Sequence, residues 1–492
     1  MTIKFSLIRK LQTPNISLVF FIFEGDDITV YSLFNYLDEI EKEYFRRIKK
    51  GIVPKEKEYK LFVMPETGRK VFLVGVGKKQ DFSLKKAVIG TRIAIVAAKK
   101  EKIDKFAFLS SPMGNAKKTR DFYEAMAANA IMANFEFNKY KTPPEGGFAC
   151  IREIEGLCLK LDINISEGFR RGTIIGEEVN ACRELANTPG GDMTPQVLAE
   201  HASRDAKGTK IKVSVFDEEK IKALGMGGIL GVARGSDEPP RFIVIEYLNG
   251  LKAKKPIVLI GKGVTFDTGG LNLKPEQAIY EMHMDMSGGS AVIHTIRAAA
   301  RLGLKKNIVG LIPAVENMPS GSSYHPGDLL RTMSGKTIEV LNTDAEGRII
   351  LADALTYAKK YNPSLVVDVA TLTGAAMVAL GQRYTGLFTS DKKLEERFRK
   401  IGEETNDPVW PLPLSTDYED EIKGTFGDWA NTGKNRNGGA TTAAVFLWQW
   451  AKDFPWVHLD IAPRMTTIDG EFLAKGAAGA PVRLLVRLLE TF

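Results

Sequence analysis

Charged side chains gather in three short stretches of this 492-residue chain, among residues that are mostly small, polar or apolar. The stretches read GKGVTFDTGGLNLK from residue 261, MHMDMSGG from residue 282 and LNTDAEGR from residue 341. Their charged residues of interest are Lys262, Asp267, Lys274, Asp285, Asp344, Glu346 and Arg348. In an extended segment alternate side chains share one side, so Asp344 and Glu346 point the same way. Arg348 has the same spacing, but the glycine before it ends the strand pattern.

Four carboxylates that meet in the fold would repel one another, because two unit charges about 4 Å apart interact by about 4 kcal/mol at an effective dielectric of about 20. One lysine and one arginine would leave the cluster negative, whereas a pair of divalent cations would not, and oxygen ligands suit magnesium, manganese and zinc. Two such ions that share a water generate hydroxide near neutral pH, which is hydrolase chemistry. Lys262 needs a partner if buried, and a neutral amine can itself bind a metal.

Histidine adds little to this metal hypothesis. The five histidines form no HExxH or HxH pair, and only His283 stands beside a candidate ligand. Taken singly, an aspartate in a glycine-rich loop is usually a turn or cap residue, and Asp344 alone would cap the helix that follows it. The hypothesis therefore depends on the three stretches meeting.

Each stretch lies where a predicted strand ends or a helix begins, which is the edge at which ligands bind in open α/β sheets. The β-branched runs PIVLIGKG, NIVGLIPAV, TIEVLN and SLVVDVATL, several followed by alanine-rich helical patterns, predict an α/β fold with a mostly parallel or mixed central sheet flanked by helices. The length predicts at least two domains. We expect a smaller N-terminal α/β domain over 1–165, a connecting helix or linker over 166–190, and a larger C-terminal catalytic domain over 191–492.

Three local patterns complete the picture of the fold. The run ISLVFFIF at residues 16–23 predicts a buried strand, since it is too short to span a membrane and no small-residue cleavage site follows it. The run VFLVGVG at residues 71–77 lacks the third glycine of a dinucleotide-binding loop and predicts a strand-to-helix turn. The C-terminal run APVRLLVRLLETF predicts a helix with one apolar face, formed by Val482, Leu485, Leu489 and Phe492.

Composition limits the cellular setting. The net charge is +8, and the surplus lies in residues 1–165, with 29 Lys and Arg against 20 Asp and Glu. Such a surplus attracts nucleic acid or simply forms a solvated lysine-rich face. Cys150, Cys158 and Cys182 form no CxxC pair, which indicates a reducing compartment and favours the cytoplasm.

Around these residues the sequence resembles the leucyl aminopeptidase family, the two-metal cytosol aminopeptidases. The stretches that follow the family pattern run from about Asn187 to Ala462 and include GKGVTFDTGGLNLKP, DMSGGSAV, NTDAEGR, DVATLTGA, NTGKNRNGGATTAAVFL and WVHLDIA. NTDAEGR is the signature of the family. Residues 1–165 resemble the family only in layout and length.

The resemblance implies a metal-dependent aminopeptidase with two divalent ions, manganese or zinc with magnesium or cobalt as alternatives. The ligands of one ion would be Lys262, Asp267, Asp285 and Glu346. The ligands of the other would be Asp267, Asp344 and Glu346, with Asp344 also giving its main-chain carbonyl. Asp267 and Glu346 would bridge the ions, and a hydroxide between them would attack the first peptide carbonyl.

The resemblance also implies the remaining roles. Lys274 would hydrogen-bond the oxyanion, Arg348 would anchor a bicarbonate that acts as general base, and Asp285 would help one ion to hold the substrate's α-amino group. A pocket for an apolar first residue, preferably leucine, would be lined by Met282, Thr371, Leu372 and Gly374. The protein would be a cytoplasmic homohexamer that acts on peptides.

The sequence departs from the family pattern at two positions. His283 stands where the family usually has Lys or Arg, and Gly191 stands where Asn is common. The basic surplus of residues 1–165 favours a DNA-binding or regulatory role, beside catalysis or in place of it. A phosphoryl-transferring enzyme with two metals would share the acidic site, but the chain contains no GxxxxGK[ST] loop.

Overall fold

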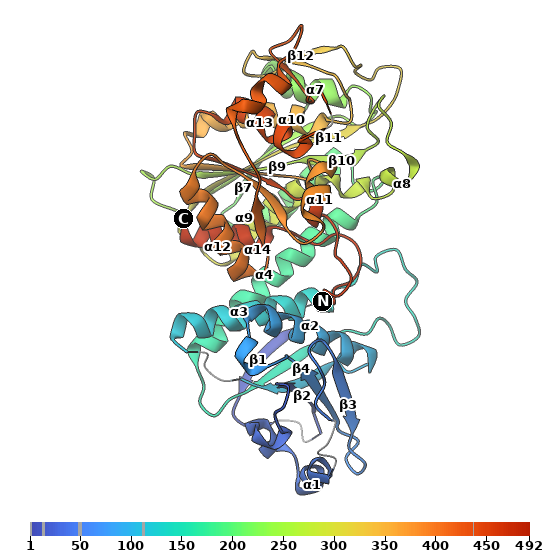
Figure 1. The fold of residues 1–492 in the computed structure, drawn as a ribbon, viewed down its shortest axis with the longest axis vertical. Coiled ribbons are helices and arrows are strands. Elements are labelled where there is room, and N and C mark those ends of the chain that lie inside the picture. Colours follow the sequence, from blue (N-terminus) through green and yellow to red (C-terminus); the bar gives the residue numbers. More distant parts are fainter. Residues whose placement is uncertain (1, 12–14, 48–51, 111–113, 436) are drawn as a thin grey trace. The chain divides into compact units, whose positions relative to one another are not determined.

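The computed structural model describes residues 2–11, 15–47, 52–110, 114–435 and 437–492. The chain divides into two compact units (Figure 1). The first unit contains the residues up to Asn180 and also Ile468–Lys475, and the second contains Ala181–Thr467 and Gly476–Phe492. Helix α4 (Ile163–Asn187) carries the chain from the first unit into the second. The domain limits expected from the sequence stay a prediction.

The first unit is built on a six-stranded sheet with the order β1-β6-β5-β2-β4-β3, in which only the β3–β4 pair is antiparallel. Its strands are β1 (Lys4–Ile8), β2 (Ser17–Ile22), β3 (Tyr59–Val63), β4 (Lys70–Gly75), β5 (Lys105–Leu109) and β6 (Glu153–Leu157). Its other helices are α1 (Glu39–Arg47), α2 (Leu84–Lys100) and α3 (Ala116–Asn134). The strand predicted near residue 16 is confirmed as β2. Gly75 ends β4 and Gly77 follows it, and the chain then turns into α2, as expected.

The second unit is built on a nine-stranded mixed sheet. Eight strands follow the order β16-β15-β18-β14-β9-β11-β8-β7, and β10 pairs with β11. The strands are β7 (Lys212–Phe216), β8 (Arg241–Leu248), β9 (Ile257–Gly261), β10 (Gly263–Asp267), β11 (Asn307–Asn317), β14 (Leu365–Ala370), β15 (Thr385–Phe388), β16 (Val409–Pro411) and β18 (Trp456–Asp460). The centre is parallel, since β14 pairs in parallel with β18 and β9, and β11 pairs in parallel with β9 and β10.

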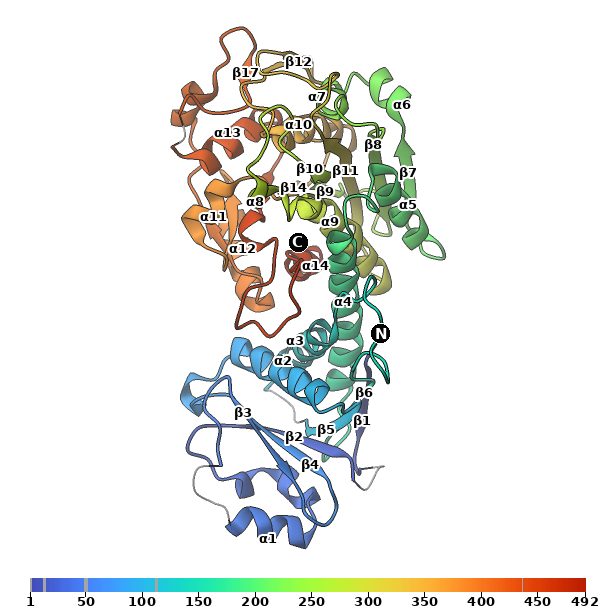
Figure 2. The same cartoon turned by 90° about the vertical axis from the view of Figure 1, so that its right-hand side faces the viewer.

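Helices cover both faces of this sheet (Figures 1 and 2). One layer contains α5 (Pro195–Ala206), α9 (Ser287–Arg301), α12 (Lys392–Thr405) and α14 (Val482–Thr491). The other layer contains α7 (Gly227–Ala233), α10 (Glu346–Ala358) and α13 (Gly439–Ala451). The remaining elements are α6 (Glu218–Ala223), α8 (Glu276–Ile279), α11 (Gly374–Leu380) and a small sheet of β12 (Leu329–Arg331), β13 (Thr337–Glu339) and β17 (Trp429–Ala430). The predicted α/β fold is confirmed.

The predicted C-terminal helix is confirmed as α14, and Val482, Leu485 and Leu489 of its predicted apolar face are buried. A single apolar face was expected, but α14 is buried from Val482 to Leu489, including Arg483 and Arg487. The reason is that α14 packs between α9 and α12, so its polar residues must also find partners inside the protein. Arg483 does so by donating to Asp407, with its Nη2 3.1 Å from Oδ1.

Asp353 fastens α10 to two neighbouring segments. Its side chain is fully buried and accepts hydrogen bonds from the backbone N–H groups of Ile229 at 3.0 Å and Met333 at 2.8 Å. Burial raises the pKa of this carboxyl to about 7, against the lowering effect of these hydrogen bonds. Since α10 begins with Glu346, this anchor also fixes the helix that carries part of the candidate site.

We expect Asp353→Ala to lower the free energy of unfolding by about 1–3 kcal/mol, because two buried N–H groups lose their acceptor. The loss should be larger at pH 5 than at pH 8. Between the ordinary pKa of 3.8 and about 7 the folded wild type keeps a proton that the unfolded chain has released, so the contribution of Asp353 falls as the pH rises through that range. Urea unfolding of both proteins at the two pH values measures it, and equal stability at pH 5 would contradict the assignment.

Candidate metal centre

Lys262 lies between β9 and β10, at the point where the chain leaves one strand and begins the next. It is 3% exposed, and its backbone N–H donates to the carbonyl of Val369 on β14. Its Nζ lies 2.8 Å from Asp285 Oδ2 and 2.8 Å from Glu346 Oε1, and it donates to the carbonyl of Thr371 at 3.1 Å. Burial opposes its charge, but Asp285 and Glu346 together with Asp267 raise its pKa.

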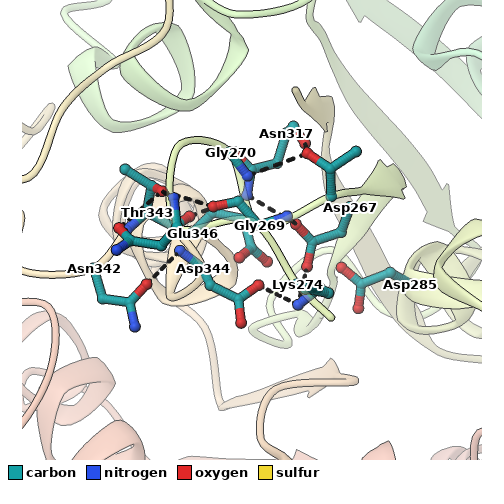
Figure 3. Close-up of polar contacts among 12 residues, drawn as sticks. Asp267, Gly269, Gly270, Lys274, Asp285, Asn317, Asn342, Thr343, Asp344 and Glu346 are labelled. Carbon is teal, nitrogen blue, oxygen red and sulfur yellow. Dashed lines mark hydrogen bonds and ion pairs between the residues drawn. The ribbon is translucent and has the colours of Figure 1, made fainter. Parts of the chain in front are cut away.

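A second lysine holds the other side of the cluster (Figure 3). Lys274 lies in the loop after β10, and its Nζ forms ion pairs with Asp267 Oδ2 at 2.8 Å and with Asp344. Burial opposes the charge of Lys274 as well, yet Asp267, Glu346 and Asp344 raise its pKa. The three stretches predicted from the sequence therefore do meet.

The carboxylates are close enough to share an ion. One oxygen each from Asp267, Asp344 and Glu346 can be chosen so that all lie within 4.8 Å of one another. Burial raises the pKa values of Asp285, Glu346 and Asp344, and neighbouring carboxylates raise them further. Glu346 Oε2 is buried and accepts no hydrogen bond from the described residues. Two ammonium groups only half neutralise four carboxylates, and a cluster of hard oxygen donors with an unused buried oxygen fits divalent cations.

The predicted substrate-binding residues divide into two groups. Thr371 joins the cluster, because its hydroxyl donates to Asp285 Oδ1 at 2.6 Å and its carbonyl accepts from Lys262. Met282 packs against the core on the α9 side of the sheet, and Leu372 packs on the α10 side. Gly374 begins α11 and is exposed. Within the described part of the chain, Met282, Leu372 and Gly374 make no hydrogen bond to the carboxylates of the cluster, and Leu372 instead donates its N–H to Asp460.

Arg348 is buried on α10, two residues beyond Glu346. Its Nη1 donates to the carbonyl of Asn431 at 2.7 Å, and its Nε has no hydrogen-bond partner among the described residues. Burial lowers the pKa of the guanidinium to about 10, so it stays positive at neutral pH. A buried cation with an unused donor is suited to an anion.

The two departures from the family pattern lie outside these contacts. His283 is half-buried in the short 3-10 helix Met282–Met286, and burial lowers its pKa. Gly191 is exposed, and a Cβ added there would meet nothing within 4 Å.

Three polar residues at the cluster were missed by the sequence analysis. Asn317, at the end of β11, donates to Asp267, and Thr343 precedes Asp344. Asp460, at the end of β18, accepts from the N–H of Leu372 at 3.2 Å and from the hydroxyl of Thr373 at 2.7 Å. The available signal for Asn317 was its place, two residues beyond the predicted strand NIVGLIPAV and so at the edge where ligands bind. Asp460 ends β18, a strand that was not predicted from the sequence.

Comparisons with known proteins identify the family. The model of the cytosol aminopeptidase family catalytic domain matches residues 180–486, and the model of the N-terminal domain of the same family matches residues 19–144. The chain belongs to the cytosol aminopeptidase family. It is therefore a peptidase, and the carboxylate cluster suits the metal dependence of the family.

Relatives match nearly the whole chain. A probable cytosol aminopeptidase of Paraburkholderia phytofirmans is 40% identical over 96% of this chain and 93% of its own, and one of Burkholderia mallei is 39% identical over 96% and 94%. Among solved structures, a mutant of tomato leucine aminopeptidase has a TM-score of 0.88 and 29% identity, covering 100% of this chain and 97% of its own. The bottromycin maturation enzyme BotP in complex with Mn has a TM-score of 0.84 and 28% identity, covering 97% of this chain and 99% of its own.

No helix of the described residues could cross a membrane.

Gly347 lets α10 approach Lys262. A Cβ at this position would lie 2.8 Å from Lys262 Nζ and 2.8 Å from its Cε. The lysine could not retreat without leaving its ion pairs with Asp285 and Glu346. Position 347 thus requires glycine because a larger side chain would have no room beside Lys262, and the turn into the helix also favours glycine there.

We expect Gly347→Ala to lower kcat/KM for a peptide substrate by about 10- to 100-fold, since small displacements of catalytic groups cost that much and the candidate metal centre includes Lys262. The melting temperature should also fall, because overpacking at a buried position costs about 1–3 kcal/mol, which the helix preference of alanine offsets only in part. Gly321→Ala is the matched control, since a Cβ at this surface position meets nothing within 4 Å. Unchanged turnover in Gly347→Ala would contradict the packing described.

Proposed function

We propose that this peptidase removes apolar N-terminal residues, leucine above all, from peptides with the help of two divalent cations. The observation that supports the proposal is the cluster at one sheet edge. Lys262 lies between Asp285 and Glu346, and oxygens of Asp267, Asp344 and Glu346 lie within 4.8 Å of one another. The relationship to cytosol aminopeptidases supports it further.

The proposed ligands divide into two overlapping sets. Asp267, Asp285 and Glu346 would hold one ion together with Lys262, whose ammonium would lose its proton when the cation binds, because a neighbouring cation lowers the pKa of an amine. Asp267, Asp344 and Glu346 would hold the other ion, and oxygens of this second set lie within 4.8 Å of one another. Manganese or zinc is proposed, with magnesium or cobalt as alternatives. Bound there, the cations would supply hydroxide near neutral pH and polarise the scissile carbonyl.

The side chains of this protein would orient the substrate and stabilise charge. Lys274 carries its ammonium between Asp267 and Asp344, where it could donate to an oxygen that becomes negative, an effect worth about 3–4 kcal/mol. Asp285 is held by Thr371 and could accept from the substrate's α-amino group. Arg348 would hold a bicarbonate as general base, for which its unpartnered Nε is the support.

Substrate choice is proposed to depend on a pocket lined by Met282, Thr371, Leu372 and Gly374. Thr371 links that pocket to Asp285, and Leu372 and Met282 would supply apolar surface. A first residue with an aliphatic side chain would gain free energy by leaving water there. From the relatives named cytosol aminopeptidase we also propose a cytoplasmic location. The homohexamer is proposed only from the resemblance of the sequence to the family.

Lys274→Ala and Asp344→Asn should each reduce release of leucine from a leucyl amide by at least about 100-fold, because each removes a charge placed at the reacting group. Circular dichroism should show both variants folded. Chelation of the wild type should abolish release, and added Mn²⁺ or Zn²⁺ should restore it. Wild-type turnover in both variants, or full activity after chelation, would refute the proposal.

A second candidate function is DNA binding by the first unit, favoured by its 29 Lys and Arg against 20 Asp and Glu in residues 1–165. Several of these lysines pair with acidic residues of the same unit, such as Lys105 with Glu155 and Lys86 with Glu56. If DNA binds, the logarithm of the affinity should fall steeply with the logarithm of salt concentration, because phosphate contacts release counterions. A titration of duplex DNA at several salt concentrations tests this, and a slope near zero removes the idea.

A further inference from the structure

We propose that Asn317 and Thr343 form a positioning unit that fixes the distance between the two loops carrying Asp267 and Asp344, and that this unit sets the affinity of the site for divalent cations. The inference rests on the proposed function, since Asp267 and Asp344 are ligands only under that proposal. Neither Asn317 nor Thr343 is among the proposed ligands, so both would act through other residues.

Asn317 connects the two loops directly (Figure 3). It is fully buried at the end of β11, opposite Asp267 in the parallel pairing of β10 with β11. Its Nδ2 donates to Asp267 Oδ1 at 2.8 Å and to the carbonyl of Thr343 at 3.0 Å. Because both partners are acceptors, the amide orientation is determined, and one side chain ties a proposed ligand to the residue before another.

Thr343 makes the second connection. Its hydroxyl donates to the carbonyl of Gly269 at 2.6 Å and accepts from the N–H of Asn272 at 2.9 Å. Its own N–H donates to Asn272 Oδ1 at 2.8 Å, and its carbonyl also accepts from the hydroxyl of Tyr324 at 2.7 Å. The loop before α10 is thus bonded to the loop after β10 at several adjacent points.

The two loops pack without free space at this place. A Cβ on Gly270, whose φ is +65°, would lie 2.9 Å from Asn317 Oδ1 and 3.0 Å from Thr343 Oγ1. A Cβ on Gly269 would lie 3.0 Å from Asp344 Oδ1. The backbone of the loop therefore lies directly against both residues, and a change in either would alter the separation of the loops.

These contacts also fix the rotation of the Asp267 carboxylate. Oδ1 accepts from Asn317 and from the N–H of Gly269 at 2.9 Å, whereas Oδ2 lies 2.8 Å from Lys274 Nζ. Residues that hydrogen-bond a metal ligand fix its orientation. Their removal typically lowers metal affinity or activity by about 10- to 100-fold. The Asn317 amide behind the Asp267 carboxylate, and the Thr343 hydroxyl that bonds the loop of Asp267, would have this effect without touching an ion.

The test measures Mn²⁺ binding by calorimetry on the full chain after chelation, with circular dichroism to show that each protein is folded. We expect Asn317→Ala and Thr343→Val each to raise the dissociation constant by about 10- to 100-fold. Thr343→Ser, which keeps the hydroxyl, should stay within about 3-fold of the wild type, and the double variant should lose less than the product of the two single losses. The Mn²⁺ concentration for half-maximal activity should shift in parallel.

Asn249→Ala is the matched control, because Asn249 Nδ2 also donates to two acceptors, Tyr247 Oη at 2.9 Å and the Leu304 carbonyl at 3.0 Å. Wild-type affinity in Asn317→Ala and Thr343→Val, or an equal loss in Asn249→Ala, overturns the inference. If Asn317→Ala does not fold, the comparison of Thr343→Val with Thr343→Ser decides. A wild type that binds no Mn²⁺ and releases no leucine contradicts the proposed function instead.

Discussion

Repulsion among buried carboxylates is the constraint on which the rest of the site depends. Asp267, Asp285 and Glu346 are each at most 3% exposed, and Asp344 lies beside them with a side chain that is 33% exposed. Water screens such charges poorly, so the surrounding protein must supply positive charge and hydrogen-bond donors. Lys262 and Lys274 supply the charge, and Asn317, Thr371 and the backbone of Gly269 supply the donors.

The mixed sheet explains how these groups reach one place. β9 pairs with residues 308–311 of β11, and β10 pairs with residues 314–317 of the same strand. Lys262 is the residue between β9 and β10. The start of α9 packs so closely on this point that a Cβ on Gly288 would lie 2.1 Å from the Val369 carbonyl, and one on Gly261 would lie 2.5 Å from the Gly288 carbonyl. Gly261 and Gly288 are therefore required by contact between backbones, and this contact also brings Asp285, three residues before Gly288, to the lysine.

The sequence predicted the charged part of this site and little of its support. Lys262, Asp267, Asp344 and their partners stand out because charge is unusual in glycine-rich, apolar surroundings. Asn317 and Thr343 do not stand out, since an amide and a hydroxyl are common in loops and their importance depends on the register of β10 against β11. The burial of α14 on all sides and the return of Ile468–Lys475 to the first unit also lie beyond local pattern, because both depend on packing between distant segments.

The loop after β14 connects Leu372, a residue of the proposed substrate pocket, to the charged centre. The carbonyl of Thr371 accepts a hydrogen bond from Lys262, and its hydroxyl donates one to Asp285. The next two residues, Leu372 and Thr373, donate hydrogen bonds to Asp460. Asp460 also accepts from the N–H of Ala462 at 3.1 Å, so a single buried carboxylate holds this loop and the end of β18 together. A substrate side chain that displaced Leu372 would also displace its neighbour Thr371. Movement of Thr371 would weaken the hydrogen bond that its carbonyl accepts from Lys262. Under the proposed function, discrimination among first residues and stability of the charged centre would therefore be linked through Thr371, Leu372 and Thr373.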